Sequence, residues 1–275
     1  MDCFVCGARM EPFLKKEFHM ERLGTCEYVK CSSCGMVVSK THYEMGKGEW
    51  QALNHECHAM YQGSDSNVFD PHWVERLNLQ ARVLADCLRE GILPAGCRAV
   101  DYGCGDGKLA DLVNALAGNP VLDKYDEYMG ISREGYVQKQ GLEGKAYDLV
   151  VTCSVFEHLL GAQDVERIFS LLKPTGTFAL HTMVCEEIPC DADWFYYLPV
   201  HCTFYTNEAM GRLFRTYGFR GCAYQVEARL WLFFRDLERW HRLREVSGSL
   251  PGAWEMAEGF VDYWKQKPYR EQPNP

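Results

Sequence analysis

Hydrophobic and polar positions follow two different rhythms along the middle of the chain. Segments with apolar residues at helical spacing occupy 108–118 and 164–173. Between and around them lie compact apolar runs that are typical of buried strands, at residues 98–103, 119–126, 147–155 and 176–184. This alternation of strand and helix predicts parallel βαβ units, and therefore an α/β fold with an open sheet covered by helices on both faces.

The flanking segments have patterns of their own. Alternating apolar and polar residues predict short strands over 13–20 and 26–31. Helical spacing predicts three helices, over 49–62, over 68–90 with Asp70-Pro71 at its start, and over 205–219 with Thr206 or Asn207 as the cap and Gly218 at the end. A strand should follow the last of these helices, and we interpret residues 230–265 as further helix.

These patterns predict two domains of very different size. The first covers residues 1–46 and is too small to build a hydrophobic core of its own. The second covers residues 47–275, with its core over 92–225 and a helical C-terminal extension over 226–275.

Composition narrows the class of protein. The chain has 275 residues, of which 47% are hydrophobic and 24% charged, as in ordinary globular proteins. It contains neither an apolar stretch long enough to cross a bilayer nor the apolar core of a signal peptide, so we expect a cytoplasmic protein without membrane contact. The formal charge of −9 disfavours nucleic acid as a partner. The sequence does not predict the oligomeric state.

Four of the fourteen cysteines form two Cys-x-x-Cys pairs near the N-terminus. Cys3 and Cys6 make the first pair and Cys31 and Cys34 the second, and each pair is followed by glycine. Glycine lets the backbone amides fold over the sulfur atoms, so the two pairs predict one tetrahedral zinc site with four thiolate ligands. Such a site has no open coordination position, and the zinc ion would be structural. Cys26 could replace one of the ligands.

The sequence DYGCGDG (residues 101–107), which we call the glycine loop, lies where a strand ends and a helix should begin. Glycines in such a turn let a ligand approach the backbone closely, and the helix that follows offers unpaired amides. The order departs from the G-x-G-x-x-G pattern of dinucleotide sites. With Asp101 at the strand end, the turn suits a nucleotide-like ligand that carries a cationic group or hydroxyls.

This loop resembles the first motif of the class I S-adenosylmethionine-dependent methyltransferases, whose fold is a Rossmann-like sheet. Further motifs follow in the order of that family: an acid after the second strand (Asp126, with Asp123 as the alternative), Glu157-His158 after the fourth strand, the Lys173 to Gly176 turn before the fifth, and HCTFYT ahead of a helix that ends in Gly218-Phe219. The resemblance is nearest to the subgroup with an N-terminal zinc ribbon, which includes C-methyltransferases of nucleotide-linked deoxysugars.

The resemblance implies a cofactor site for S-adenosylmethionine. Asp126 would hold the ribose hydroxyls, and Tyr61 resembles a tyrosine that the subgroup places over the cofactor. The residues that would line the site are Tyr61, Asp101, Gly103, Cys104, Gly105, Asp126, Ser154, Val155 and His158.

The chain also departs from the family pattern in two places. Only 21 residues separate Asp126 from Asp148, so the third strand should be short or missing. Ser154 stands where the related quinone-pathway O-methyltransferases have the first glutamate of a metal-associated Glu-x-x-Glu-His set. We therefore expect no catalytic metal.

Methyl transfer to carbon or oxygen benefits from a general base near the carboxyl ends of the strands. His181 and His201 are the leading candidates because histidine can accept a proton near neutral pH. Glu187 and Tyr205 are the next candidates. Cys153 as a nucleophile, by analogy with RNA cytosine methyltransferases, is the less favoured chemistry. The aromatic run 194–197 could line a lid over the substrate or pack as a surface loop.

Taken together, these features predict a methyltransferase that acts on a carbon or oxygen atom of a small molecule, such as a sugar nucleotide or a secondary metabolite. Two alternatives remain open at this point. One is an RNA methyltransferase that grips its substrate with the ribbon, and the other is an inactive binding protein with the same fold.

Overall fold

The computed structural model describes residues 1–59, 72–128, 135–142 and 146–262. Its strands are β1 (Met10–Glu17), β2 (Thr25–Cys31), β3 (Val37–Ser39), β4 (Ala99–Tyr102), β5 (Leu122–Tyr125), β6 (Tyr147–Cys153), β7 (Leu172–His181), β8 (Val184–Cys185), β9 (Thr203–Thr206), β10 (Gly221–Gln225), β11 (Leu230–Phe234) and β12 (Trp254–Glu258). Its helices are α1 (Lys40–Glu44), α2 (Lys47–Ala59), α3 (Trp73–Arg89), α4 (Lys108–Ala117), α5 (Lys139–Leu142), α6 (Ala162–Ser170), α7 (Asn207–Thr216) and α8 (Leu237–Val246), with short 3-10 helices η1 (Phe156–His158) and η2 (Ser247–Ser249).

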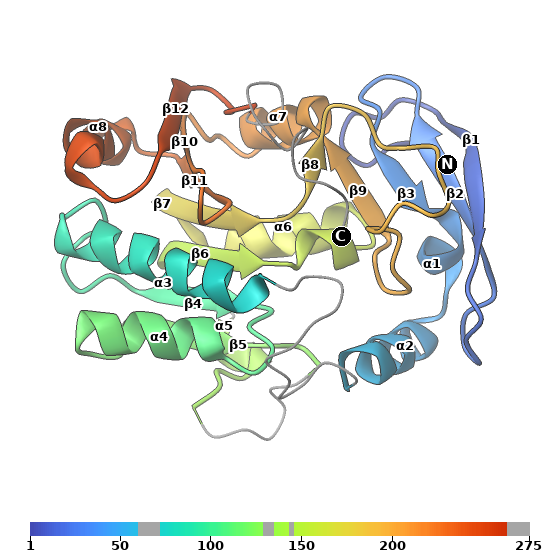
Figure 1. The fold of residues 1–275 in the computed structure, drawn as a ribbon, viewed down its shortest axis with the longest axis horizontal. Helices are drawn as coiled ribbons and strands as arrows, with labels where there is room; N and C mark the ends of the chain where they lie inside the picture. The colour runs from blue at the N-terminus through green and yellow to red at the C-terminus, as the bar shows by residue number, and fades with distance from the viewer. Residues whose placement is uncertain (60–71, 129–134, 143–145, 263–275) are drawn as a thin grey trace.

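Seven strands form the larger sheet, in the order β12-β10-β11-β7-β6-β4-β5. Strands β5, β4, β6 and β7 are parallel, whereas β11, β10 and β12 pair antiparallel beyond β7 (Figure 1). The first six residues of β6 are buried, because a central parallel strand is covered on both faces. Its side chains alternate between the two cores: Val150 belongs to one and Val151 to the other.

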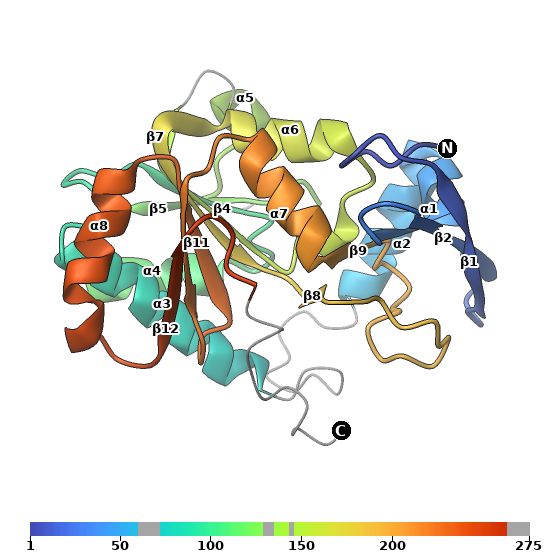
Figure 2. The same cartoon turned by 90° about the horizontal axis from the view of Figure 1, so that it is seen from above.

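Helices cover both faces of this sheet, as Figure 2 shows. Helices α3, α4 and α8 contribute buried residues such as Leu84, Val113 and Leu243 to the core on one face. Helices α6 and α7 contribute residues such as Ile168 and Leu213 to the core on the other. The predicted α/β architecture with a Rossmann-like sheet is therefore confirmed.

A second sheet has the order β1-β2-β3-β9-β8. Its first three strands come from the N-terminal cysteine-rich segment, which we call the ribbon (residues 1–46), and the other two come from the segment after β7. The two parts meet where β3 pairs antiparallel with β9, with Val37 opposite Phe204 and Val38 opposite Thr203. One continuous sheet thus crosses the boundary expected at residue 46, and the domain limits themselves stay a prediction.

Most of the predicted elements are present. The strands expected around the glycine loop correspond to β4, β5, β6 and β7, and the helices between them to α4 and α6. Between Asp126 and Tyr147, the described residues contain helix α5, and their only β-pairing is a single parallel bridge from Tyr136 to Lys124. We expected a short or missing third strand, and within the described residues this one bridge stands at its place. The Asp70-Pro71 cap lies outside the described residues.

The helical C-terminal extension over 226–275 is a wrong prediction. Only α8 is a regular α-helix in the described part of this region, and strands β11 and β12 lie on either side of it. The run Leu230 to Phe234 is buried throughout, with Trp231 and Phe233 in one core and Leu232 and Phe234 in the other. A short, wholly apolar run cannot be assigned to strand or helix by periodicity, and here its aromatic residues fit a central strand.

Within the described ranges, none of the helices combines the length and the apolar character that a membrane crossing requires.

Candidate functional site

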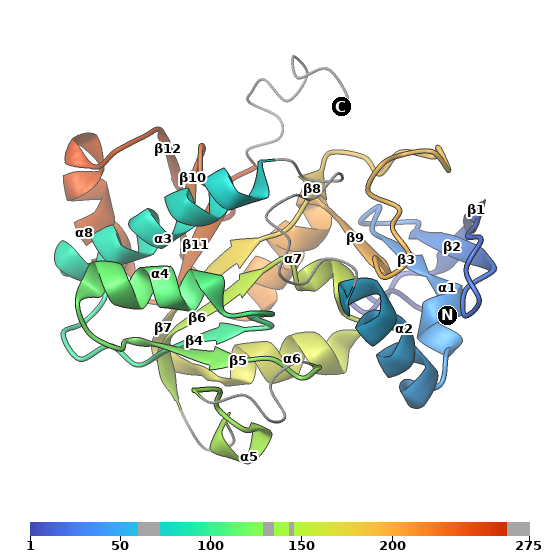
Figure 3. The same ribbon diagram turned by 60° about the horizontal axis from the view of Figure 1, so that its bottom comes forward.

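The glycine loop after β4 lies at the carboxyl edge of the parallel strands, which run toward the side of the molecule where the ribbon lies (Figure 3). Asp101 is buried in β4, only 2% exposed. The amides of Gly103 and Cys104 donate to the carbonyl oxygen of Tyr125 at 2.8 and 3.1 Å. These bonds fix the loop against the end of β5, and α4 then starts at Lys108.

Asp126 holds the same loop through its carboxylate. Its Oδ2 accepts from the amide of Gly105 and its Oδ1 from the amide of Tyr128, both at 2.9 Å. From the other side, the hydroxyl of Tyr136 donates to the carbonyl oxygen of Gly105 at 2.8 Å. Asp123, the alternative to Asp126, is exposed within β5 and does not reach the loop in any described hydrogen bond.

Two glycines of the loop differ in their surroundings. Both have a positive φ, +76° at Gly103 and +56° at Gly105. A Cβ on Gly103 would lie 2.6 Å from Cγ2 of Val155, so this glycine is required by packing. A Cβ on Gly105 would meet no described atom within 4 Å. Among the described residues, packing therefore does not explain this glycine, whereas a ligand that approaches the backbone closely would require it.

The electrostatics of the loop favour a cationic ligand. Burial raises the pKa of Asp101 to about 7, and the nearby Asp126 carboxylate raises it too. Asp101 consequently holds its proton to a higher pH than an ordinary aspartate does. A positive group placed beside it would favour the carboxylate form.

Ser154 and Val155 come directly after β6. The amide of Ser154 donates to the carbonyl oxygen of His181 at 2.9 Å, and Ser154 has a left-handed backbone with φ +57°. Such strain in a residue other than glycine is concentrated at functional sites. The structure thus brings Ser154 and Val155 to the same edge as the glycine loop, with Val155 against Gly103. Tyr61 lies outside the described residues.

A second group of polar residues, which we call the Glu157 group, lies at η1. One carboxylate oxygen of Glu157 and one ring nitrogen each of His158 and His201 lie within 4.8 Å of one another. The Glu157 side chain is buried and accepts two hydroxyl hydrogen bonds, from Tyr196 to Oε1 and from Thr182 to Oε2, both at 2.8 Å. The rings of His158 and His201 meet edge to face, with their centroids 5.0 Å apart.

His201 is held in one tautomer. Its Nδ1 lies 2.9 Å from the carbonyl oxygen of Tyr196, which can only accept, so Nδ1 carries the proton. Its Nε2 then has a lone pair that can accept a proton. The Tyr196 ring packs against the imidazole, with centroids 4.5 Å apart.

His181 has the same tautomer but different electrostatics. Its Nδ1 lies 2.8 Å from the carbonyl oxygen of Arg229 and donates to it. Burial lowers the pKa of His181 well below its ordinary value, and the guanidinium groups of Arg76 and Arg229 lower it as well. His181 therefore has little tendency to hold a proton taken from a substrate.

The two remaining base candidates are placed elsewhere. Tyr205 is fully buried in β9, and its hydroxyl donates to the carbonyl oxygen of Phe156 at 3.3 Å. The Glu187 side chain is 77% exposed and pairs with Lys30 of the ribbon at 2.8 Å. Neither joins the group around Glu157, because a β-strand facing the core carries the first and a surface loop the second. Burial raises the pKa of Cys153 well above its ordinary value, so this thiol is not a nucleophile near neutral pH.

The four ribbon cysteines converge on one point. Their Sγ atoms lie within 4.8 Å of one another, with 3.7 Å between Cys3 and Cys34 and 3.4 Å between Cys6 and Cys31. The amides of Ser33 and Cys34 point at Sγ of Cys31, both at 3.4 Å, as the following glycine permits. Cys26 is buried in β2 outside this group.

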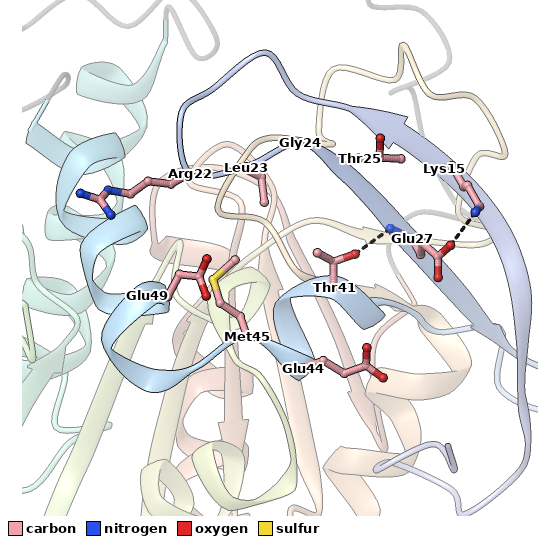
Figure 4. Close-up of a pocket in the computed structure, with 10 residues that line it drawn as sticks. All are labelled: Lys15, Arg22, Leu23, Gly24, Thr25, Glu27, Thr41, Glu44, Met45 and Glu49. Carbon is pink, nitrogen blue, oxygen red and sulfur yellow. Dashed lines mark hydrogen bonds and ion pairs between the residues drawn. The ribbon is translucent and has the colours of Figure 1, made fainter.

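A separate hollow of about 550 Å³ lies on the ribbon, between the β1–β2 hairpin and helices α1 and α2 (Figure 4). Charged side chains of both signs line it, among them Lys15, Arg22, Glu27 and Glu49. None of its lining residues belongs to the glycine loop or to the Glu157 group.

Sequence reasoning missed several residues that the structure places at these sites. Tyr136, Thr182 and His42 belong to no recognisable motif, and each acts through a contact with a residue distant in the chain. Tyr196 was part of the aromatic run, but nothing in the sequence connected it with Glu157. No local signal would have revealed these partners.

Comparison with solved structures finds similar methyltransferases. Magnesium protoporphyrin IX methyltransferase from Synechocystis, with bound S-adenosylhomocysteine, is 15% identical, with a TM-score of 0.45 over 71% of this chain and 100% of its own. Human N-acetylserotonin methyltransferase, in complex with S-adenosylmethionine, is 14% identical, with a TM-score of 0.40 over 69% and 68%. An O-methyltransferase family protein from Burkholderia thailandensis is also 14% identical, with a TM-score of 0.40 over 68% and 71%. Because identities and TM-scores are this low, no conclusion rests on these likenesses.

A search of curated proteins returns no match. A family model described as a methyltransferase domain matches residues 72–223, which is more than half of the chain and includes both the glycine loop and the Glu157 group. The chain therefore belongs to this methyltransferase-domain family, and it is a methyltransferase.

Proposed function

We propose that the protein transfers the methyl group of S-adenosylmethionine to an oxygen or carbon atom of a small molecule, with His201 as the general base. The observation that carries this proposal is the contact between Nδ1 of His201 and the carbonyl oxygen of Tyr196, which fixes the proton on Nδ1 of a residue in the Glu157 group at the carboxyl side of the sheet. An acceptor hydroxyl or carbon acid must lose a proton when it is methylated, and a neutral imidazole can take it.

The residues of the glycine loop fit the cofactor. S-adenosylmethionine supplies a methyl group on a positively charged sulfur. Asp101 offers a buried carboxyl group that a cationic ligand would hold in its ionised form. No described atom lies within 4 Å of a Cβ built on Gly105, which supports a close approach of the ligand to the backbone there. Asp126 can hold ribose hydroxyls beside its two amide bonds, because each carboxylate oxygen accepts more than one hydrogen bond.

His201 is a better base than His181 for an electrostatic reason. Protonation of His181 would place a third positive charge beside Arg76 and Arg229, whose guanidinium groups already lower its pKa. His201 instead lies beside the buried Glu157 carboxylate, which would stabilise the imidazolium that forms. Tyr196 and Thr182 hold that carboxylate in place.

The ribbon cysteines fit a structural zinc ion. Zinc–sulfur bonds of about 2.3 Å place the sulfur atoms of a tetrahedral site about 3.8 Å apart, and the observed separations of 3.7 and 3.4 Å are close to this value. All four positions would be filled by thiolates. The zinc ion would stabilise the fold and take no part in the reaction.

The cofactor part of the proposal is tested by calorimetric titration with S-adenosylhomocysteine. We expect one binding site per chain in the wild-type protein. The absence of binding would contradict the proposal. The acceptor is then sought with methyl-labelled S-adenosylmethionine and a panel of phenols, sugars, sugar nucleotides and RNA, where label in RNA alone would contradict the choice of a small molecule.

The role of His201 is tested with His201→Ala and with the control His241→Ala on the exposed side of α8. General base catalysis contributes about 10²- to 10⁴-fold, so we expect a loss of kcat of that order in the His201 variant alone. The affinity for S-adenosylhomocysteine should not change in either variant. A kcat for His201→Ala equal to that of the control would exclude His201 as the base.

A further inference from the structure

The ribbon grips the segment that carries His201. The carbonyl oxygen of Pro199 lies 2.9 Å from Nε2 of His42, and the carbonyl oxygen of Cys202 accepts from the amide of Ser39 at 2.8 Å. His201 lies between these two attachment points. The ribbon therefore fixes the backbone on both sides of the proposed base.

His42 makes this contact in one defined state. The Pro199 carbonyl can only accept, so Nε2 of His42 carries the proton, and Nδ1 accepts from the hydroxyl of Ser39 at 2.6 Å. Burial lowers the pKa of His42 to about 4, so the ring is neutral in the neutral pH range. The ring also meets that of Trp50 in α2 edge to face, with centroids 5.4 Å apart.

The opposite side of the segment is attached to the site itself. The amide of Cys202 donates to the carbonyl oxygen of Glu157 at 2.8 Å. The hydroxyl of Thr203 donates to the carbonyl oxygen of Leu159 at 2.6 Å. The segment is thus clamped between the ribbon and η1, and the imidazole of His201 is set against His158 and Tyr196 by this clamp.

We propose that His42 is a positioning residue for His201, and that the ribbon forms part of the methyl-transfer site through the His42–Pro199 hydrogen bond. The inference rests on the proposed function, because positioning matters only if His201 acts on the acceptor. If the buried N–H donor of His42 were removed, the carbonyl oxygen of Pro199 would lose its hydrogen bond. The segment that carries His201 would then shift so that this oxygen could find another donor. A shift of about 1 Å at a catalytic group can cost about 100-fold in rate.

The test reads the two imidazoles directly, by long-range ¹H–¹⁵N correlation in zinc-loaded protein labelled at histidine. In the wild-type protein we expect the proton on Nε2 of His42 and on Nδ1 of His201. A proton on Nδ1 of His42 would overturn the proposal without any variant, since the bond to Pro199 would then not exist.

Three variants extend the test. His42→Phe keeps an aromatic ring against Trp50 but removes both ring nitrogens, including the donor to Pro199, and we expect His201 to lose its single-tautomer signature. His42→Gln offers an amide donor in place of Nε2 and should restore that signature. His241→Phe, on the exposed side of α8, is the matched control and should leave His201 unchanged.

The outcomes separate this inference from the proposed function. Every variant used should have the zinc content and the affinity for S-adenosylhomocysteine of the wild-type protein. If His42→Phe does not meet this criterion, it is left out. The test then uses His42→Gln and the wild-type measurement alone. An unchanged His201 signal in His42→Phe, or equal changes in the Phe and Gln variants, would overturn the positioning role. Failure of His201→Ala to lower kcat would instead overturn the function and leave the positional result intact.

Discussion

At the scale of the residue, the site is built from carboxyl groups that are taken out of water. Asp101 and Glu157 are each 2% exposed. Burying an ionised carboxylate is costly unless hydrogen bonds or opposite charges compensate it. Glu157 has two hydroxyl donors within the protein. Burial and the nearby Asp126 carboxylate raise the pKa of Asp101, and the positive charge of Lys124 offsets only part of this effect.

The raised pKa of Asp101 predicts opposite pH dependences for stability and binding. The ordinary pKa of the Asp101 carboxyl group is 3.8, and its raised pKa in the folded protein is about 7. Between these two pH values, the folded protein binds the carboxyl proton more tightly than the unfolded chain does. The contribution of Asp101 to stability therefore falls as the pH rises through this window. A cationic ligand needs the carboxylate, so the affinity for S-adenosylmethionine should increase as the pH rises through about 7.

The variant Asp101→Asn should remove both effects. We expect a ligand-free protein that is more stable than the wild type above pH 7, and a Kd for S-adenosylmethionine that is weaker and independent of this titration. Thermal unfolding and calorimetry at about pH 6, 7 and 8 measure the two quantities. Asp123→Asn, at an exposed position of β5, is the control. If Asp101→Asn bound the cofactor as tightly as the wild type, the prediction would be contradicted.

Gly105 predicts a separation of binding from stability. Gly105→Ala and the control Gly118→Ala both place a side chain at a positive φ with no described atom within 4 Å of the new Cβ. Each should cost about 1–2 kcal/mol of stability through the left-handed backbone. Only Gly105→Ala should weaken the binding of S-adenosylhomocysteine. The methyl group of the new alanine would lie where the proposed ligand approaches the loop. Equal affinities in the two variants would place the ligand elsewhere.

At the scale of the element, helix α7 connects the two sheets through the residue that caps it. The hydroxyl of Thr206 accepts from the amide of Ala209 at 3.1 Å and so caps α7. The same hydroxyl donates to the carbonyl oxygen of Cys34 in the ribbon. One side chain thus starts a helix of the larger unit and holds a cysteine pair of the smaller one.

This double role predicts that Thr206 is sensitive to substitution. Thr206→Val keeps the shape but removes the cap, which should cost about 1–2 kcal/mol in the free energy of unfolding, measured in urea. Thr216→Val, exposed at the other end of α7, should have little effect. Thr206→Ser restores the hydroxyl and should recover most of the loss. Equal stability of Thr206→Val and the Thr216→Val control would show that the cap contributes nothing.

At the scale of the whole molecule, the ribbon is part of the architecture and not an appendage. Its strand β3 extends the sheet that contains β9, and its cysteines pack into the same core as α6 and α7. The carboxyl edge of the larger sheet and the ribbon are therefore neighbouring parts of one structure, as Figure 3 shows. The consequences of metal loss should reach beyond the ribbon.

Removal of the proposed zinc ion should therefore affect the proposed acceptor side of the site more than the proposed cofactor side. Cys34→Ser should lose zinc, measured by elemental analysis, and amide exchange should become faster in β2, β3 and β9. The affinity for S-adenosylhomocysteine should change less than the rate of methyl transfer, because the glycine loop is held by β5 and not by the ribbon. Cys190→Ser, an exposed cysteine outside the cluster, is the control. Full zinc content in Cys34→Ser would contradict the four-cysteine site.

The sequence by itself determined the features that depend on short stretches of chain. The alternation of strands and helices, the glycine loop with Asp101, and the two Cys-x-x-Cys pairs are all visible in local patterns. These features depend on backbone periodicity and on spacing within a turn, which a short segment encodes completely. The run Leu230 to Phe234 was misread for the complementary reason, since a run buried on both faces has no period to read.

Only the tertiary structure decided which distant residues meet. His42 and Pro199 are 157 positions apart, Tyr196 and Glu157 are 39 apart, and β3 joins β9 across most of the larger unit. Such contacts arise from the way whole faces of sheets and helices bury one another, and no local pattern records them. For this reason the position of the glycine loop between a strand and a helix could be predicted from the sequence, while the surroundings of the proposed base could not.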